Sequence, residues 1–185
     1  DEPSVTAAPS REPDAGSRGP LHGITIVDLS RVLSGPYCSM VLADLGARVI
    51  KVEPPGAGDD SRGFGPFSDG QSAYFAAFNR GKESLAPDLR QAPDRAAFER
   101  LLDGADVLLD NYRPGVLARL GYPRETIEAR WPHLVHASIS GFGQDGPYAT
   151  RTAYDLIIQA MSGVMSLTGN EGQGPARVGT SIVDI

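Results

Sequence analysis

The segment over residues 23–59, GITIVDLSRVLSGPYCSMVLADLGARVIKVEPPGAGD, constrains the fold of this chain more than any other. In order, it holds an apolar run over residues 24–27, a turn over 30–36, a helical pattern over 37–45 that Gly46 ends, and a second apolar run over 49–52. Strand, loop, helix and strand in this order are typical of a βαβ unit, which requires a parallel sheet. We therefore predict an α/β fold with a Rossmann-like parallel sheet flanked by helices.

The rest of the chain continues this alternation. Strands are expected over residues 83–89 (at an edge, because of Pro87), 105–109 and 134–139, and helices over 72–79, 93–103, 114–120, 126–130 and 156–165. The apolar positions over 178–183 predict the strand of an unfinished βαβ unit. The long loop over 59–82 carries several aromatic residues, which indicate a functional rather than a disordered loop and which we expect to pack on the sheet as core.

Residues 1–20 are rich in Pro, Ser, Ala and charged residues, and we interpret them as a disordered tail before a single unit over residues 21–185. The tail lacks the apolar centre of a signal peptide, and its four acidic residues argue against a mitochondrial transit peptide. Because the chain does not begin with Met, we expect its true start to be missing. The single cysteine, Cys38, cannot form an internal disulfide, which fits a reducing compartment and predicts a cytoplasmic protein.

Charge and hydropathy exclude two classes of partner. The net charge of −6 argues against nucleic acid, although Arg31, Arg48 and Lys51 in the opening unit leave room for a bound polyanion. The chain has no apolar run of about 18 residues, which predicts no membrane span.

The familiar cofactor motifs do not occur. The loop SRVLSGP has one glycine where a pyrophosphate-binding loop needs G-x-G-x-x-G, so a nicotinamide or flavin cofactor is disfavoured. His22, His133 and His136 do not have metal-ligand spacing, and we predict no metal site. The remaining candidates are carboxylates at strand ends or in loops. They are Asp28, Glu53, Asp110, Asp155 and Asp184. Capping or solvated roles are the default for each, and the pattern alone does not choose among them.

A resemblance to a known family distinguishes among these carboxylates. The run LHGITIVDLSRVLSGPYCSMVLADLGARVIKVEPPGAGDDSR is similar to the N-terminal motif of the class III CoA-transferases, the formyl-CoA transferase and carnitine CoA-transferase group (CaiB/BaiF-like). The similarity continues through FNRGKESLAPDLR, DVLLDNYRPGVLARLGY, ASISGFGQDGP, TAYDLIIQAMSGVMSLTG and VGTSIVDI, over residues 21–185. It implies the N-terminal part of the large domain of an interlocked homodimeric enzyme about twice this long. A fragment without the second half is expected to be inactive.

The resemblance implies transfer of coenzyme A (CoA) from an acyl-CoA donor to a carboxylic acid acceptor, with Asp184 as the nucleophile. The intermediates are an aspartyl mixed anhydride and an aspartyl-CoA thioester, which need neither a metal nor a prosthetic group. The family's CoA-binding positions fall on residues of several loops. They are Arg31, Val32, Leu33, Ser34, Arg90, Asn111, Tyr112, Arg119 and Tyr154.

Departures from the family pattern limit the substrate and leave alternatives. Pro54 stands where some transferases have an arginine for the adenine end, which puts that contact in doubt, and Leu33 replaces a glutamine of the formyl-CoA branch, which disfavours oxalate or formate. Tyr154 stands where the racemase branch has a histidine base, which disfavours an α-methylacyl-CoA racemase. That racemase or a carnitine-dehydratase-like enzyme remains an alternative, as do a nicotinamide-dependent oxidoreductase and a non-catalytic fragment.

Overall fold

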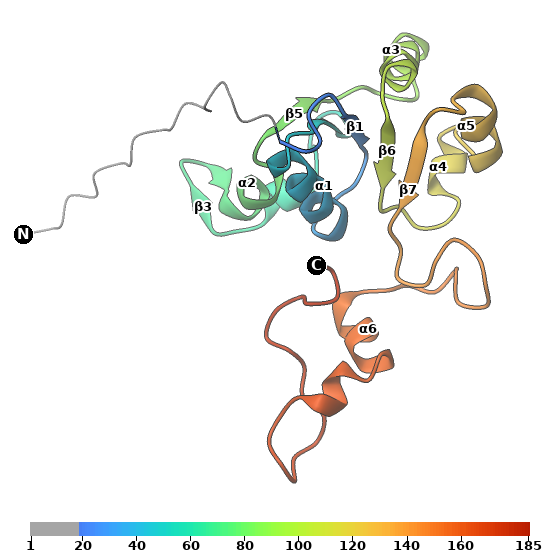
Figure 1. The fold of residues 1–185 in the computed structure, drawn as a ribbon. Coiled ribbons are helices and arrows are strands. Elements are labelled where there is room, and N and C mark those ends of the chain that lie inside the picture. The colour runs from blue at the N-terminus through green and yellow to red at the C-terminus, as the bar shows by residue number, and fades with distance from the viewer. Residues whose placement is uncertain (1–18) are drawn as a thin grey trace, which may run out of the picture.

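The computed structural model describes residues 19–185, and the tail predicted for residues 1–20 lies, except for Gly19 and Pro20, outside the described residues. The core of the fold is a five-stranded sheet (Figure 1). Its strands are β1 (Thr25–Asp28), β2 (Arg48–Val52), β5 (Lys82–Leu85), β6 (Val107–Asp110) and β7 (Val135–Ser138). They follow the order β5-β2-β1-β6-β7, and each pair is parallel. The predicted α/β fold with a Rossmann-like parallel sheet is confirmed.

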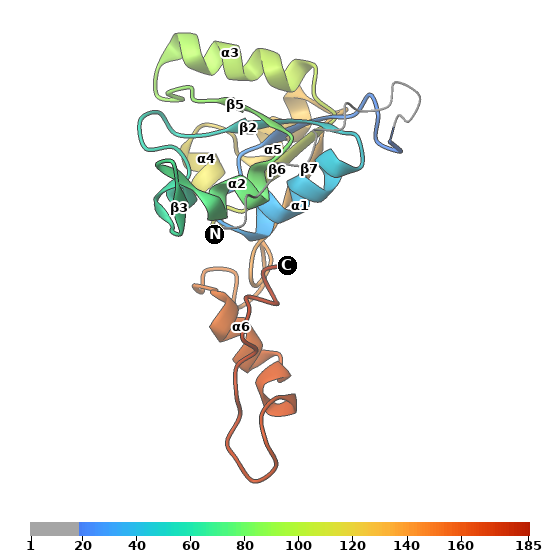
Figure 2. The ribbon, with the colours of Figure 1, turned by 90° about the vertical axis from the view of Figure 1, so that its left-hand side faces the viewer.

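Helices cover both faces of this sheet (Figure 2). They are α1 (Ser34–Asp44), α3 (Ala92–Asp103), α4 (Val116–Arg119) and α5 (Arg124–Arg130). One face packs against α3, α4 and α5 around Phe98, Leu108 and Trp131, each at most 2% exposed. The other face packs against α1 around Ile26 and Val49. Because both faces are covered, the central strands β1, β2 and β6 carry adjacent buried apolar residues rather than alternating ones.

The strand order places the loops that follow β1 and β6 side by side. From β1 the chain passes through α1 to β2 and on to β5 at one edge, whereas β6 lies on the other side of β1 and leads to β7. The two connections therefore leave the carboxyl ends of adjacent strands in opposite directions. Open parallel sheets bind ligands in the crevice at such a switch point.

The C-terminal part forms a lobe that extends from the carboxyl edge of the sheet and returns to it (Figures 1 and 2). Its helix α6 (Asp155–Met161) is shorter than the predicted 156–165, because Gly163 takes a positive φ of 83° and a 3₁₀ helix, η2 (Val164–Leu167), follows. The strand predicted over 178–183 is wrong: this segment has no regular structure. Within residues 19–185 no strand pairs with this segment, so side chains rather than a sheet hold its backbone.

The long loop over 59–82 is also more ordered than predicted. It contains the 3₁₀ helix η1 (Asp60–Gly63), a hairpin of β3 (Phe67–Ser68) and β4 (Gln71–Ser72), and α2 (Ala73–Asn79). Its aromatic side chains do not form core on the sheet, which corrects our expectation. Phe64 packs edge-on against Tyr74, Tyr74 packs against Phe78, and Phe64 and Phe67 are exposed.

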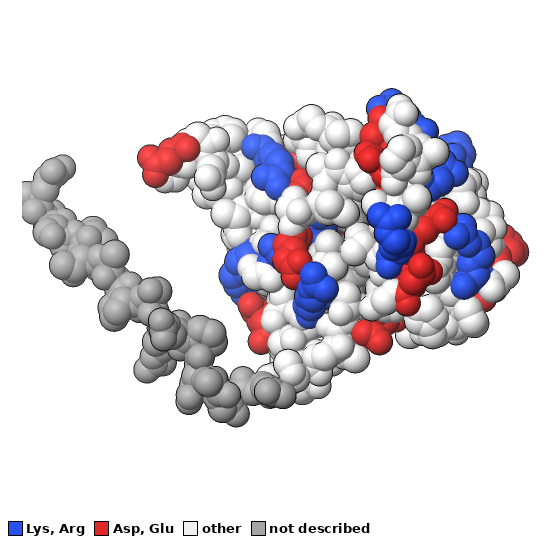
Figure 3. All heavy atoms as spheres, turned by 90° about the horizontal axis from the view of Figure 1, so that it is seen from above, with Lys and Arg blue, Asp and Glu red and all other residues white. Residues whose placement is uncertain are grey.

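Among residues 19–185, no helix combines the length and the apolar character that a membrane crossing requires. The same residues hold no cluster of His, Cys, Asp and Glu suited to a metal ion. On the face seen in Figure 3, basic side chains lie beside acidic ones instead of forming one continuous basic patch.

Candidate active site

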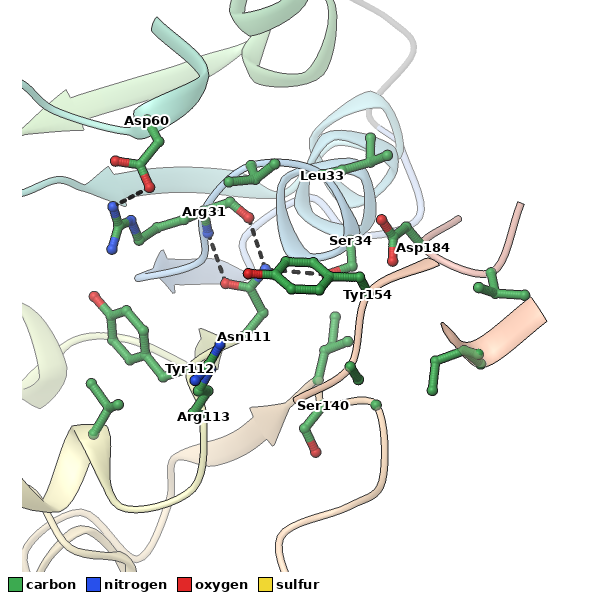
Figure 4. A pocket seen from close by; sticks show the side chains of 17 residues that line it. Arg31, Leu33, Ser34, Asp60, Asn111, Tyr112, Arg113, Ser140, Tyr154 and Asp184 are labelled. Carbon is green, nitrogen blue, oxygen red and sulfur yellow. Dashed lines mark hydrogen bonds and ion pairs between the residues drawn. The ribbon is translucent and has the colours of Figure 1, made fainter. Parts of the chain in front are cut away.

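A cavity of about 570 Å³ opens at the carboxyl edge of the sheet, at the switch point between β1 and β6 (Figure 4). Its walls come from the loops after β1, β6 and β7 and from the C-terminal lobe. Predicted site residues that line it are Arg31, Val32, Leu33, Ser34, Asn111, Tyr112, Tyr154 and Asp184. The structure thus brings together eight of the ten residues carried over by resemblance, from three separate parts of the chain.

The loop over residues 31–34 is fixed through its backbone. Asn111, from the loop after β6, accepts a hydrogen bond from Arg31 N at 2.8 Å and donates one to Arg31 O at 2.8 Å. Val32 has a φ of +67°, which is an outlier for a β-branched residue and costs about 1–3 kcal/mol. The carboxylate of Asp59 accepts from Val32 N at 3.2 Å and so helps to hold this strained position.

A buried ion pair lies beneath the same loop. Lys51 Nζ contacts Asp59 Oδ2 at 2.8 Å, with the two side chains 2% and 0% exposed, and it also donates to Ser30 O at 2.9 Å. Burial alone raises the pKa of Asp59, but Lys51 and the N–H and hydroxyl of Ser61 outweigh it and hold that pKa below its usual value. Sequence reasoning noted Lys51 only as a local positive charge and missed Asp59. The signal was present, because Asp59 lies within the stretch over residues 21–62 that resembles the family motif.

Asp184 enters the cavity from the other end of the chain. In Figure 4 its carboxylate lies toward Leu33 and Ser34, with the ring of Tyr154 nearby. Asp184 is half-buried, and this burial, followed by the negative charge of Asp155, raises the pKa of its carboxyl group. Tyr154 precedes α6 and is 68% exposed. A raised pKa marks a carboxylate that is poorly solvated, which increases its reactivity once it is ionised.

A second cavity of about 370 Å³ adjoins the first. Arg31, Tyr112 and Val116 line both, and Arg90 lines only the second one, where it pairs with Asp88 at 2.7 Å. The structure therefore places Arg90 beside the predicted site but outside the first cavity. Arg119, the tenth carried-over residue, lines neither cavity. It is exposed at the end of α4, the helix that begins with Val116.

The other strand-end carboxylates have structural partners. Asp28 accepts hydrogen bonds from Ser30 and Ser39, Glu53 pairs with Arg62 at 2.6 Å, and Asp110 accepts from Tyr112 N and contacts His136 at 2.8 Å. These contacts occupy the oxygens that a substrate would need. Asp184 is the carboxylate among the five candidates that lines the cavity.

Two buried polar atoms at the cavity lack a partner within residues 19–185. They are Arg31 Nε and Ser140 Oγ, and both residues line the first cavity. Both atoms can donate a hydrogen bond, and a buried donor without a partner costs about 1–3 kcal/mol. A ligand carboxylate or carbonyl in the cavity would remove that cost. Sequence reasoning did not single out Ser140, although this residue lies within ASISGFGQDGP, one of the stretches that resemble the family.

Comparisons with known proteins agree on one family. A family model described as CoA-transferase family III matches residues 21–185. Acetyl-CoA:oxalate CoA-transferase from Acetobacter aceti is 51% identical over 172 residues, which make up 92% of this chain and 44% of that protein. Succinyl-CoA:glutarate CoA-transferase from Mus musculus is 45% identical over 173 residues, 93% of this chain and 40% of that protein.

A solved structure shows the same likeness in three dimensions. The crystal structure of a CAIB/BAIF family protein from Brucella suis superposes with a TM-score of 0.85 and 44% sequence identity, over 91% of this chain and 46% of that one. The chain spans less than half the length of each of these three relatives. The family resemblance read from the sequence motifs is confirmed.

Proposed function

Because the chain belongs to CoA-transferase family III, we propose that the protein containing it moves CoA from an acyl-CoA donor to a carboxylic acid acceptor, with Asp184 as the nucleophile. The observation that carries this proposal is the convergence at one cavity. Asp184 faces the loop over 31–34, some 150 residues earlier in the chain, across a space that Asn111 and Tyr112 also line.

The reaction requires two exchanges at the same aspartate. The carboxylate of Asp184 attacks the thioester carbonyl, the C–S bond breaks, and CoA leaves as a thiolate while a mixed anhydride forms. The thiolate then attacks the aspartyl carbonyl, which releases the donor acid and gives an aspartyl-CoA thioester. The acceptor carboxylate repeats both steps in reverse, so that acceptor-CoA forms and the aspartate returns. No proton, electron or water is consumed, and each step exchanges bonds of similar energy.

The two adjoining cavities suggest how CoA lies. The thioester end belongs beside Asp184, and the chain of CoA then passes Arg31 and Tyr112, which line both cavities. The nucleotide end would reach the second cavity, where Arg90 offers a guanidinium group to phosphate. Asn111 supports this arrangement indirectly, because its amide binds the loop over residues 31–34 and not the ligand.

The acceptor class follows from the relatives and from the unpartnered donors. The two enzymes compared above are named for oxalate and glutarate, which are both dicarboxylic acids. A dicarboxylate offers one carboxylate to the reaction and a second one to Arg31 Nε or Ser140 Oγ. We therefore propose a small dicarboxylic acid as acceptor. The relative named for oxalate keeps oxalate among the acids to be tested, although Leu33 argues against it.

The full-length protein is proposed to work as a homodimer in which further chain completes the cavity. The lobe beside Asp184 exposes large apolar side chains that an isolated chain would leave in water. They are Tyr154, Leu156, Ile157, Met161, Leu167 and Ile182. Neither a racemase nor an oxidoreductase gains support from the cavity, because Tyr154 supplies no proton-transfer base and the single-glycine loop offers no pyrophosphate cradle.

Trapping the intermediate tests the proposal. The full-length protein is incubated with an acyl-CoA and hydroxylamine, which should convert one aspartate to a hydroxamate at Asp184. Asp184→Asn should abolish both the trapping and the exchange, and in the wild-type protein peptides that contain Asp155 should stay unmodified. Label on another residue, or exchange that survives the substitution, contradicts the mechanism. A thermal shift with CoA but not with NAD would separate the proposal from the oxidoreductase alternative.

A further inference from the structure

The segment that carries Asp184 has no secondary structure of its own to hold it in place. Residues 178–184 lie in bends, turns and irregular backbone, without a strand or helix. Within the described part of the chain, side chains from α6 make the hydrogen bonds that join this segment to the rest of the protein. The two residues are Asp155 and Gln159, four positions apart and therefore on one face of the helix.

Gln159 is the buried centre of this attachment. Its side chain is fully buried, although α6 is otherwise exposed on most positions. Its Oε1 accepts from Val178 N at 2.8 Å, and its Nε2 donates to Thr180 O at 3.3 Å and to Asp155 Oδ2 at 2.7 Å. The amide thus uses its acceptor and its donors at once, which fixes its orientation.

Asp155 extends the same attachment toward the nucleophile. Its Oδ1 accepts from Val183 N at 3.1 Å, one residue before Asp184, while its other oxygen accepts from Gln159. The hydrogen bond from Gln159 therefore fixes the carboxylate that in turn fixes Val183. Both ends of the segment, at Val178 and at Val183, depend on the buried amide.

We propose that Gln159 is a positioning residue that sets the place of the Asp184 carboxylate in the cavity, an inference that rests on the proposed function. Gln159 lines neither cavity, so it acts without touching CoA or acid. A misplacement of a reacting group by about 1 Å can cost about a hundredfold in rate. Loss of the amide should consequently slow attack on the thioester while leaving CoA binding intact.

The test compares Gln159→Leu with a matched control, Thr168→Val, in the full-length protein. Leucine keeps the buried volume and removes all three hydrogen bonds of the amide. Thr168 Oγ1 donates to Ala176 O just before the segment, so its loss loosens the same lobe without touching residues 178–184. We expect Gln159→Leu to form the trapped Asp184 intermediate about a hundredfold more slowly in a single turnover, with an unchanged Kd for CoA, and Thr168→Val to react at the wild-type rate.

The outcomes separate the two hypotheses. A wild-type rate of trapping in Gln159→Leu overturns the positioning role. Losses of similar size in CoA affinity, melting temperature and rate overturn it as well. In either case, label on Asp184 still supports the transferase mechanism. Label on another residue overturns both. If Gln159→Leu does not fold, Gln159→Glu replaces it at pH 8, because the ionised glutamate keeps the length and the acceptor but loses the donor. The same slow trapping is then expected, and a wild-type rate again overturns the role.

Discussion

Asn111 holds both backbone groups of Arg31, a residue 80 positions earlier in the chain. Its Oδ1 accepts from Arg31 N and its Nδ2 donates to Arg31 O, each at 2.8 Å, and Nδ2 also donates to Ser34 Oγ at 3.1 Å. The two loops leave adjacent parallel strands, β1 and β6, and these bonds join them (Figure 4). An amide has the required acceptor and donor in one planar group, whereas a carboxylate has only acceptors.

Asn111→Asp should therefore weaken binding more than Asn111→Ala does. The alanine variant loses three hydrogen bonds, each worth about 0.5–1.5 kcal/mol, and we expect its affinity for acyl-CoA to fall by about tenfold. The aspartate variant keeps a partner for Arg31 N but sets a carboxylate oxygen against Arg31 O, so a further loss is expected. Calorimetric titration with CoA gives both values. Gln144→Ala, which removes an exposed amide contact to Ser138 outside this cavity, serves as control, and a higher affinity in Asn111→Asp than in Asn111→Ala would refute the argument.

Asp59→Asn should destabilise the protein strongly, because it leaves the ammonium group of Lys51 buried without a countercharge. Breaking such a buried pair costs about 3–5 kcal/mol of unfolding free energy. The contrasting variant is Glu83→Gln, which breaks the exposed pair with Arg48 and should change the melting temperature little. Denaturant unfolding of the three proteins measures the difference. Equal effects of the two substitutions would show that burial of the Lys51–Asp59 pair does not matter.

The same ion pair gives a stability that depends on pH. The pKa of Asp59 is lowered in the folded protein, so the unfolded chain binds more protons as the pH falls. Its contribution is complete above about pH 4, the ordinary pKa of an aspartate, and is lost as the pH falls through the lowered folded value. We expect the wild-type protein to lose stability over that acidic range, and Asp59→Asn to show a smaller change there. Parallel acid unfolding curves would argue against this assignment.

The fold was predictable where local pattern and tertiary packing agree. The apolar runs that became β1, β2 and β6 lie between helices on both faces, and for that reason their adjacent residues are apolar and buried, at 26–27, 49–50 and 108–109. The predicted strand over 178–183 failed because apolar residues there contact α6 and the cavity instead of a neighbouring strand. An apolar pattern in the sequence indicates which residues are buried, but it does not indicate which element packs against them.

The candidate site was predictable only in part. Resemblance selected Asp184 from five similar carboxylates, and Asp184 is the one of the five that lines the cavity. The supports of the site escaped notice, because Asp59 lies in a loop and Gln159 in an apolar helix. Each acts on a backbone group far from it in the sequence, Val32 N and Thr180 O among them. Such hydrogen bonds join residues at no regular spacing in the sequence, so a sequence pattern does not predict them.

Arg90→Ala should weaken binding of the nucleotide end of CoA and leave the thioester end unaffected. Arg90 lines the second cavity, which Asp184 does not line, and its guanidinium is exposed beside Asp88. We expect KM for an acyl-CoA to rise by about fivefold, as is typical for loss of one exposed ionic contact, and KM for the matching acyl-pantetheine to stay constant. Arg124→Ala, which removes an exposed arginine paired with Glu128 on α5, is the matched control. An equal rise of KM for both substrates would show that Arg90 does not contact the nucleotide end of CoA.

The acid limb of the pH–rate profile should follow the ionisation of the Asp184 carboxyl group. Burial and the charge of Asp155 raise its pKa, and only the ionised form attacks a thioester. The rate of the trapped step should therefore rise with pH through a value above about 3.9, the usual pKa of an aspartate, and level off beyond it.

The Asp155→Asn variant tests this assignment. It removes the negative charge beside Asp184, so the acid limb should move to lower pH. The plateau should fall as well, because asparagine has one acceptor oxygen where Asp155 has two, so the hydrogen bond from either Gln159 or Val183 N is lost. Asp145→Asn, an exposed change outside the cavity, should leave limb and plateau alone. A limb that stays in place in Asp155→Asn would assign the titration to another group.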